Sequence, residues 1–203
     1  MAADVSNPDL GWLRQHFATA RPPAGTLYGD QDARPGATEL RAASVLVPIV
    51  AREDEPTVLF TQRTAHLKSH SGQISFPGGR AEAADASPER TALRETLEEV
   101  GLPEARIEVL GRLPDYHTRT GYLITPVVGI VQPPFELQPD PNEVAEVFEV
   151  PLAFLMDVRN HQRHSREHEG MQRSYFAIPW RDRYIWGATA GMLVNLYRYL
   201  SGE

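Results

Sequence analysis

The stretch Arg94-Glu95-Thr96-Leu97-Glu98-Glu99-Val100-Gly101-Leu102 carries the clearest signal of fold and chemistry in this chain of 203 residues. It predicts a helix from about Pro88 to Val100, because Ser87 is a good N-cap, proline fits the first helical position and Gly101 supplies a C-terminal stop. At about 100° per residue, one face of this helix is apolar and should pack on a sheet. That face comprises Leu93, Leu97 and Val100.

Three carboxylates, those of Glu95, Glu98 and Glu99, fall within an arc of about 100° on the other side of this helix. Crowded like charges repel and mildly destabilise even an exposed helix. A divalent cation relieves the repulsion, since carboxylate oxygens suit Mg²⁺ or Mn²⁺, and Arg94 is placed to brace one carboxylate. The alternative is a solvated acidic face, which most glutamate pairs on helices form.

The segment before the helix favours metal binding. Phe76-Pro77-Gly78-Gly79 lies upstream, followed by an acidic loop. We expect the glycine pair to form a turn, because paired glycines take positive φ or let the backbone approach a ligand. A strand, a glycine turn, an acidic loop and a carboxylate helix in this order form an unusual combination.

These residues resemble the Nudix box, Gly-x5-Glu-x7-Arg-Glu-U-x-Glu-Glu-x-Gly-U, where U is aliphatic. Two positions depart from it. Thr96 replaces an aliphatic residue, and the stretch from Gly79 to Arg94 is one residue longer, so the upstream acid is either Glu82 or Asp85. The matching positions are Arg94, Glu95, Glu98, Glu99, Gly101 and Leu102.

The resemblance implies an α+β fold, a Nudix-type α/β/α sandwich with a mixed β-sheet, and hydrolysis that depends on Mg²⁺ or Mn²⁺. Glu95 and Glu99 would hold the principal ion, Glu98 would complete or share that site, and Arg94 and Glu98 would be catalytic. The general base stays open between three residues, because in such enzymes it need not lie in the box. The three are Glu98, Glu143 and Glu146, and a further metal ligand is the alternative role for Glu143 and Glu146.

A second motif runs from Leu59 to Gly79 and is similar to the coenzyme A pyrophosphatase signature, Leu-Leu-Thr-x-Arg-(Ser/Ala)-x3-Arg-x3-Gly-x3-Phe-Pro-Gly-Gly. Phe60, Thr64 and Lys68 depart from it conservatively. The resemblance implies cleavage of coenzyme A to 4′-phosphopantetheine and adenosine 3′,5′-bisphosphate, with acyl-CoA and oxidised CoA as further candidates. The residues expected to bind substrate are Arg63, Lys68, Gly72, Phe76, Gly78 and Gly79.

The charge pattern agrees with a polyanionic substrate. From Pro56 to Ala81 the chain has no Asp or Glu, but it carries Arg63, Lys68 and Arg80. A basic, acid-free segment beside a carboxylate cluster suits a polyanion bridged by metal ions; ordinary surface solubility is the alternative for these cations. Two other functions stay open: hydrolysis of another nucleoside diphosphate derivative such as ADP-ribose or NADH, and a non-catalytic Nudix scaffold that only binds nucleotide.

Composition limits the remaining possibilities. A net charge of -7 disfavours binding to nucleic acid or to an anionic membrane, and the absence of cysteine excludes disulfides and thiolate metal sites. No apolar run approaches the roughly 20 residues that span a bilayer, and residues 1–10 show no signal peptide. We therefore expect a cytoplasmic protein, and the sequence leaves a homodimer open. A helix and Pro/Gly-rich arm (1–37) should precede one hydrolase domain (38–203).

The other elements follow from periodicity and turn residues. Strands are expected at 43–50, 57–61, 106–112, 123–131, 144–149 and 175–179, and helices at 10–17, 151–158 and 186–200. The polar stretch His161 to Glu169, with His161, His164 and His168, is more typical of a mobile loop than of a zinc site. Gly187 is assigned to close helix packing. The tryptophans, assigned to the core or an interface, are Trp12, Trp180 and Trp186.

Overall fold

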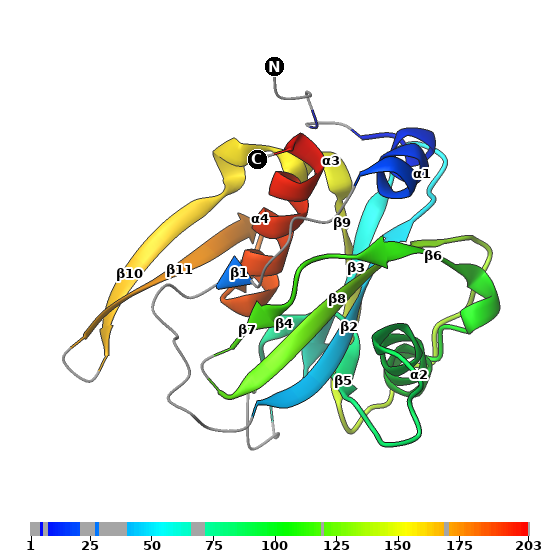
Figure 1. Cartoon of the computed structure of the whole chain (residues 1–203), viewed down its shortest axis with the longest axis horizontal. Coiled ribbons are helices and arrows are strands. Elements are labelled where there is room, and N and C mark those ends of the chain that lie inside the picture. The colour runs from blue at the N-terminus through cyan, green and yellow to red at the C-terminus, as the bar shows by residue number, and fades with distance from the viewer. Residues whose placement is uncertain are drawn as a thin grey trace.

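The computed structural model describes residues 5, 8–20, 27–28, 40–65, 72–118, 120–168 and 171–202 (Figure 1). Its helices are α1 (Leu10–Thr19), α2 (Pro88–Val100), α3 (Leu152–Met156) and α4 (Ala188–Ser201), with 3-10 turns at Glu104–Arg106 and Val158–Asn160. Its strands are β1 (Leu27–Tyr28), β2 (Arg41–Val50), β3 (Thr57–Arg63), β4 (Ile74–Ser75), β5 (Gly78–Arg80), β6 (Ile107–Arg112), β7 (Tyr116–His117), β8 (Tyr122–Val131), β9 (Val144–Pro151), β10 (Gln162–His168), β11 (Met171–Trp180) and β12 (Arg183–Trp186).

Among the described residues, a mixed sheet of nine strands forms the centre of the fold. Strand β2 pairs in parallel with β8 from Arg41 opposite Tyr122 to Val50 opposite Val131, and antiparallel with β3 and β5. Strand β9 adds to the outer side of β3, and β6 to β8. The apolar run at the end of β2 is buried on both faces, as expected of a central strand that has layers on either side.

Helices cover both faces of this sheet, and the side chains of β2 alternate between them. Leu46 and Val50 face α2, where they pack with Ala92 and with Val100 respectively. Val47 and Ile49 face the larger core on the opposite side, which α1, α3 and α4 complete. The predicted α+β sandwich with a mixed sheet is therefore confirmed. No helix among the described residues is long and apolar enough to cross a bilayer.

The chain between His161 and Glu169 differs from the sequence prediction. It was expected to be a mobile loop, but Gln162–His168 forms strand β10, paired with β11 in a ribbon that extends away from the body of the molecule (Figure 1). Most of the β10 side chains are exposed, so the strand has no apolar alternation to reveal it. His161 contacts the Leu155 carbonyl oxygen at 2.7 Å, whereas His164 stacks on Tyr175.

Helix α1 is attached to the body of the domain. Its N-cap is Asp9, and Leu13 is fully buried in the larger core. Arg14 makes a two-pronged ion pair with Glu108 on β6, with a shortest N–O distance of 2.7 Å. The Pro/Gly-rich arm lies largely outside the described residues, so the division at residue 37 remains a prediction.

Candidate active site

Helix α2 begins and ends as its caps predict. The Ser87 hydroxyl accepts a hydrogen bond from the Arg90 N–H, and Gly101 takes the left-handed conformation, with φ 70°. The predicted apolar face is wrong at Leu97, which is 51% exposed. Thr96 is buried instead, and its hydroxyl donates to the Ala92 carbonyl oxygen at 2.7 Å. This bond satisfies the hydroxyl within the helix, so threonine can occupy a position where the box has an aliphatic residue.

Glycines let α2 approach the sheet closely. The predicted glycine turn is wrong, because Gly78–Arg80 is the short strand β5, with Gly79 opposite Ser44. A side chain at Gly79 would collide with the Glu95 carboxylate, and one at Gly78, where φ is 155°, would collide with the β2 backbone. Gly78 therefore requires glycine, whereas a side chain at Gly79 would displace the end of the Glu95 side chain, since Gly79 brings the backbone of β5 against this carboxylate of α2.

Glu99 is the most enclosed carboxylate of the site, at 7% exposed. Its Oε2 accepts a hydrogen bond from the Gly78 N–H at 3.1 Å, and its Oε1 lies 3.8 Å from Arg63 Nη1. Loss of solvation outweighs these contacts and raises the pKa of Glu99 to about 7. Burial also raises the pKa of Glu95, and the negative charge of Glu143 raises both pKa values further.

Arg94 holds the acidic groups in place. Its guanidinium donates to both oxygens of Asp85 at 3.1 and 2.9 Å, to Glu95 at 2.9 Å and to Glu98 at 3.1 Å. A further bond reaches the Arg80 carbonyl oxygen at 3.0 Å and ties α2 to β5. Of the two upstream acids, Glu82 and Asp85, it is Asp85 that binds Arg94, and Arg94 holds the pKa of Asp85 far below its usual range.

The three candidate bases lie in different surroundings. Glu98 is 59% exposed at its side chain and contacts Arg94. The loop carrying Glu143 is fixed at the end of β3, where the Thr64 N–H donates to the Glu143 carbonyl oxygen at 2.9 Å. Glu146 is not brought to the cluster: both of its oxygens are bound by Arg183, at 2.6 and 2.7 Å.

The composition of the site fits a hard divalent cation. Five carboxylates face two guanidinium groups, so the site has an excess of negative charge on oxygen ligands. In the described part of the chain, no three acidic or imidazole side chains converge closely enough to hold an ion as they are placed. The residues that could supply its ligands are Glu95, Glu98 and Glu99.

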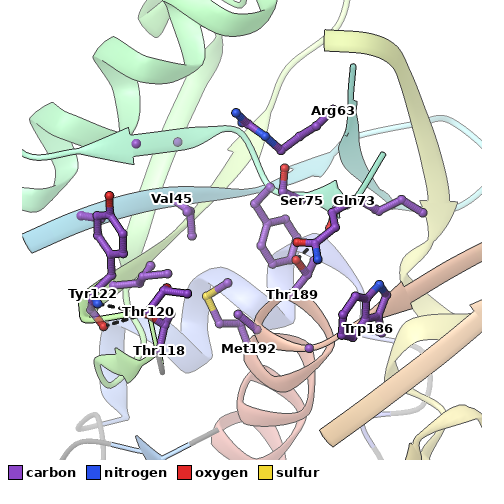
Figure 2. A pocket seen from close by; sticks show the side chains of 18 of the residues that line it. Val45, Arg63, Gln73, Ser75, Thr118, Thr120, Tyr122, Trp186, Thr189 and Met192 are labelled. Carbon is purple, nitrogen blue, oxygen red and sulfur yellow. Dashed lines mark hydrogen bonds between the residues drawn. The ribbon is translucent and has the colours of Figure 1, made fainter. Parts of the chain in front are cut away.

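A pocket of about 660 Å³ adjoins β5. In Figure 2 the side chains of Thr118, Met192, Thr189 and Trp186 lie below β2 and β5, whereas Arg63 lies above these strands, on the side of α2. Two arginines, Arg63 and Arg80, contribute to its wall together with Gly78 and Gly79. The remaining wall mixes hydroxyl, amide and apolar groups and includes Val45, Gln73, Ser75, Phe76, Thr118, Thr120, Tyr122, Ile124, Trp186, Thr189 and Met192.

Two sequence assignments change at this pocket. Trp186 was assigned to the core or an interface; it is 40% exposed and lines the pocket, so the core assignment is wrong and the interface assignment stays a prediction. Gly187 has φ 63° and open space around its Cα, so backbone conformation and not close packing requires glycine there. Close packing occurs one turn later, where a side chain at Gly191 would lie 2.5 Å from the Tyr116 hydroxyl.

The predicted substrate-binding residues are only partly brought together. Arg63, Gly78 and Gly79 line the pocket. Phe76 is 2% exposed and stacks on Phe60, so it acts chiefly as the floor. Gly72, at φ 69°, is absent from the described pocket wall, and Lys68 lies outside the described residues.

Comparison with known proteins establishes the family. The NUDIX domain model matches residues 40–171. The protein called uncharacterized Nudix hydrolase NudL is 40% identical in Photorhabdus laumondii subsp. laumondii over 156 residues, covering 77% of this chain and 83% of the relative. Its counterpart from Escherichia coli (strain K12) is 41% identical over 157 residues, covering 77% and 81%. Among solved structures, the Nudix hydrolase RenU of M. smegmatis aligns with a TM-score of 0.47 and 24% identity, over 55% of this chain and 71% of that one.

The chain therefore belongs to the Nudix hydrolase family. It is an enzyme that acts on a small nucleoside diphosphate derivative, and its family generally uses divalent metal ions.

Proposed function

We propose that the enzyme hydrolyses the diphosphate bond of coenzyme A to 4′-phosphopantetheine and adenosine 3′,5′-bisphosphate. One observation carries this proposal: Arg63, from the segment that lacks acidic residues, lies 3.8 Å from Glu99 and also lines the pocket. A diphosphate bound by Arg63 would thus lie between the carboxylates and a pocket large enough for an organic group. Acyl-CoA and oxidised CoA belong to the same substrate class.

The metal ion in this proposal is Mg²⁺ or Mn²⁺, with Glu95 and Glu99 as principal ligands and Glu98 completing or sharing the site. When bound, it would neutralise oxygens of the diphosphate. Arg94 is assigned to orienting Glu95 and Glu98, since its guanidinium contacts both. The glycines of β5 leave room for the β2 backbone beside Gly78 and for the Glu95 carboxylate beside Gly79.

Hydrolysis proceeds by in-line attack of water on one phosphorus. The bond from that phosphorus to the bridging oxygen breaks, the bridging oxygen leaves with the other phosphate, and a carboxylate accepts the proton of water. Glu98 and Glu143 are the candidates for this base. Glu146 is disfavoured, because Arg183 binds both of its oxygens and lowers its pKa.

Mass analysis of products from coenzyme A, ADP-ribose and NADH, each with Mg²⁺ and with Mn²⁺, tests the proposal. In ¹⁸O-water we expect the label in one of the two coenzyme A products. Release of labelled inorganic phosphate with dephospho-coenzyme A would refute diphosphate cleavage. Faster turnover of ADP-ribose or NADH would assign a different substrate, and tight binding without turnover would indicate a scaffold.

Two further expectations belong to this proposal. The cytoplasm is the compartment we propose, because coenzyme A is available there as substrate; cell fractionation tests it. A homodimer remains a prediction, which light scattering of the purified protein would test.

A further inference from the structure

We propose that the pocket beside β5 takes the pantetheine arm of the substrate, with Trp186 as a specificity-determining contact. This inference rests on the proposed function, because the pantetheine arm is the part of coenzyme A that carries no phosphate beyond the diphosphate. It specifies the orientation of the bound substrate: the pantetheine arm lies in the pocket, and the adenosine 3′-phosphate end lies outside it.

Charge in the pocket supports this direction. Its described lining residues include two arginines and no carboxylate, although the chain has a net charge of -7. Arg63 is close to Glu99, and Arg80 directly follows Gly79 on β5, so both cations belong to the wall shared with the carboxylate site. A diphosphate at this wall meets positive charge, and what extends beyond it meets neutral side chains.

The chemistry of the neutral wall matches an amide chain. Thr118 and Thr120, which lie between β7 and β8, and Tyr122 on β8 bring hydroxyl groups to the wall, and the Thr118 hydroxyl also bonds to the backbone of Tyr122. Val45 and Met192 offer apolar surface in the same pocket. The pantetheine arm likewise combines polar and apolar groups: it has two amides, a hydroxyl and a dimethyl-substituted carbon. Sites for such ligands are mostly apolar, with a few polar groups that fix orientation.

Trp186 forms an open wall of this pocket. Figure 2 shows Trp186 and Tyr122 at opposite ends, with Met192 between them. Trp186 is 40% exposed, and its ring meets Tyr175 edge to face, with 5.6 Å between ring centroids and planes at 70°. Large exposed aromatic side chains at a pocket are frequent binding anchors. A ligand seated here would cover the indole.

The alternative is the reverse orientation, with adenosine in the pocket. The first turn of α4 also lines the pocket, and a helix N-terminus favours a phosphate. The 3′-phosphate would then lie at Ala188. In this alternative, a change in the pocket would weaken binding of adenosine 3′,5′-bisphosphate and not of 4′-phosphopantetheine. Measuring the binding of each product therefore distinguishes the two orientations.

The experiment uses Trp186→Ala, with Tyr184→Ala as the matched control. Tyr184 lies two residues earlier on β12 and is similarly exposed, at 44%, but it is absent from the described pocket lining. Calorimetry with Mg²⁺ measures binding of 4′-phosphopantetheine and, separately, of adenosine 3′,5′-bisphosphate. A second variant, Ala188→Phe, fills the pocket from the first position of α4 and keeps the test valid should Trp186→Ala misfold.

We expect Trp186→Ala and Ala188→Phe to weaken 4′-phosphopantetheine binding by about 10-fold or more, to leave adenosine 3′,5′-bisphosphate unchanged, and to raise KM equally for coenzyme A and dephospho-coenzyme A. Tyr184→Ala should change none of these values. Selective loss of adenosine 3′,5′-bisphosphate would reverse the orientation, and unchanged binding of both products would remove the pocket from the substrate path. If the wild-type chain cleaves coenzyme A, either result overturns only this inference; no cleavage by the wild type would refute the proposed function itself.

Discussion

The two sides of β5 differ sharply in charge. Towards α2, the strand meets the carboxylates of Glu95 and Glu99, whose pKa values are raised by burial; Arg94 binds Glu95, and the Gly78 N–H donates to Glu99. Towards the pocket, it meets Arg80, neutral side chains and, within the described lining, no carboxylate, while Arg63 lines the pocket and also lies 3.8 Å from Glu99. The difference indicates that the two sides of β5 have different roles: the carboxylates near α2 are suited to bond cleavage, and the pocket lining is suited to substrate recognition. The glycines permit this arrangement, since a side chain at Gly79 would displace Glu95.

The largest effect should come from the carboxylate side. Glu99→Gln or Glu95→Gln should lower kcat by at least about 10³-fold, because the electrostatic stabilisation of the reacting diphosphate is lost. Glu104→Gln, which removes a surface charge paired with Arg90, is the control and should retain full activity. Near-wild-type turnover by either active-site variant at low Mg²⁺ would disprove the ligand assignment.

The second largest effect should be the pH dependence of stability that comes from Glu99. Its folded pKa of about 7 lies above its ordinary value of 4.5, so the folded state binds the proton more tightly than the unfolded state. The stability of the metal-free protein should therefore fall as pH rises from about 4.5 to about 7, by up to about 3 kcal/mol from this group.

Glu99→Gln isolates this contribution, because the lowered pKa values of Asp85, Glu89 and Asp157 act in the opposite direction and are shared by both proteins. In urea unfolding with EDTA, the variant should be more stable at pH 7 and equal to wild type near pH 4.5. A constant difference across this range would mean that Glu99 titrates normally.

The next largest effect should come from Gly79, which lies on β5 between the carboxylates and the pocket. Gly79→Ala should lower kcat by about 10²-fold, since a displacement of about 1 Å at a catalytic group has that effect. The double variant with Glu95→Gln should lose little more than Glu95→Gln alone, because both changes act on one carboxylate. Additive losses would show that Gly79 acts separately from Glu95.

The smallest effect should come from the pocket side. Arg63→Ala should raise KM about 10-fold or more through loss of a charge-assisted hydrogen bond, and equally for coenzyme A and dephospho-coenzyme A, since Arg63 lies beside Glu99. Arg52→Ala, which removes an arginine paired with Glu149, is the control. A loss confined to coenzyme A would assign Arg63 to the 3′-phosphate and break the division across β5.

Local signals allowed the carboxylate side to be predicted from the sequence. Ser87, Pro88 and Gly101 define the ends of α2 through contacts within a few residues, and the spacing of Glu95, Glu98 and Glu99 places them by helix geometry alone. The same geometry was wrong about Leu97. Helix geometry shows which residues share a face, but it does not show which face the sheet covers. Because α2 lies against β5, Glu99 is buried and accepts a hydrogen bond from the Gly78 N–H.

The pocket could not be predicted in this way. Its wall combines β5, the β7–β8 turn and the start of α4, segments whose proximity depends on the whole sheet. Trp186 has no local feature that distinguishes a pocket residue from a core residue. Strand β10 was missed for a related reason: its backbone bonds to β11 hold it in place, and its exposed side chains give no periodic signal.

The contacts of Arg183 indicate where a label could be attached to this protein. Besides binding Glu146, it donates to Gln62 at 2.9 Å and lies over the Phe148 ring, which fastens β12 to the central sheet near the base of the ribbon. Trp186 is three residues further along β12 and contacts the ribbon at Tyr175, whereas His168 pairs with Met171 at the far end of the ribbon. That tip is accordingly the natural attachment point for a fluorophore or a surface tether that should leave the pocket undisturbed.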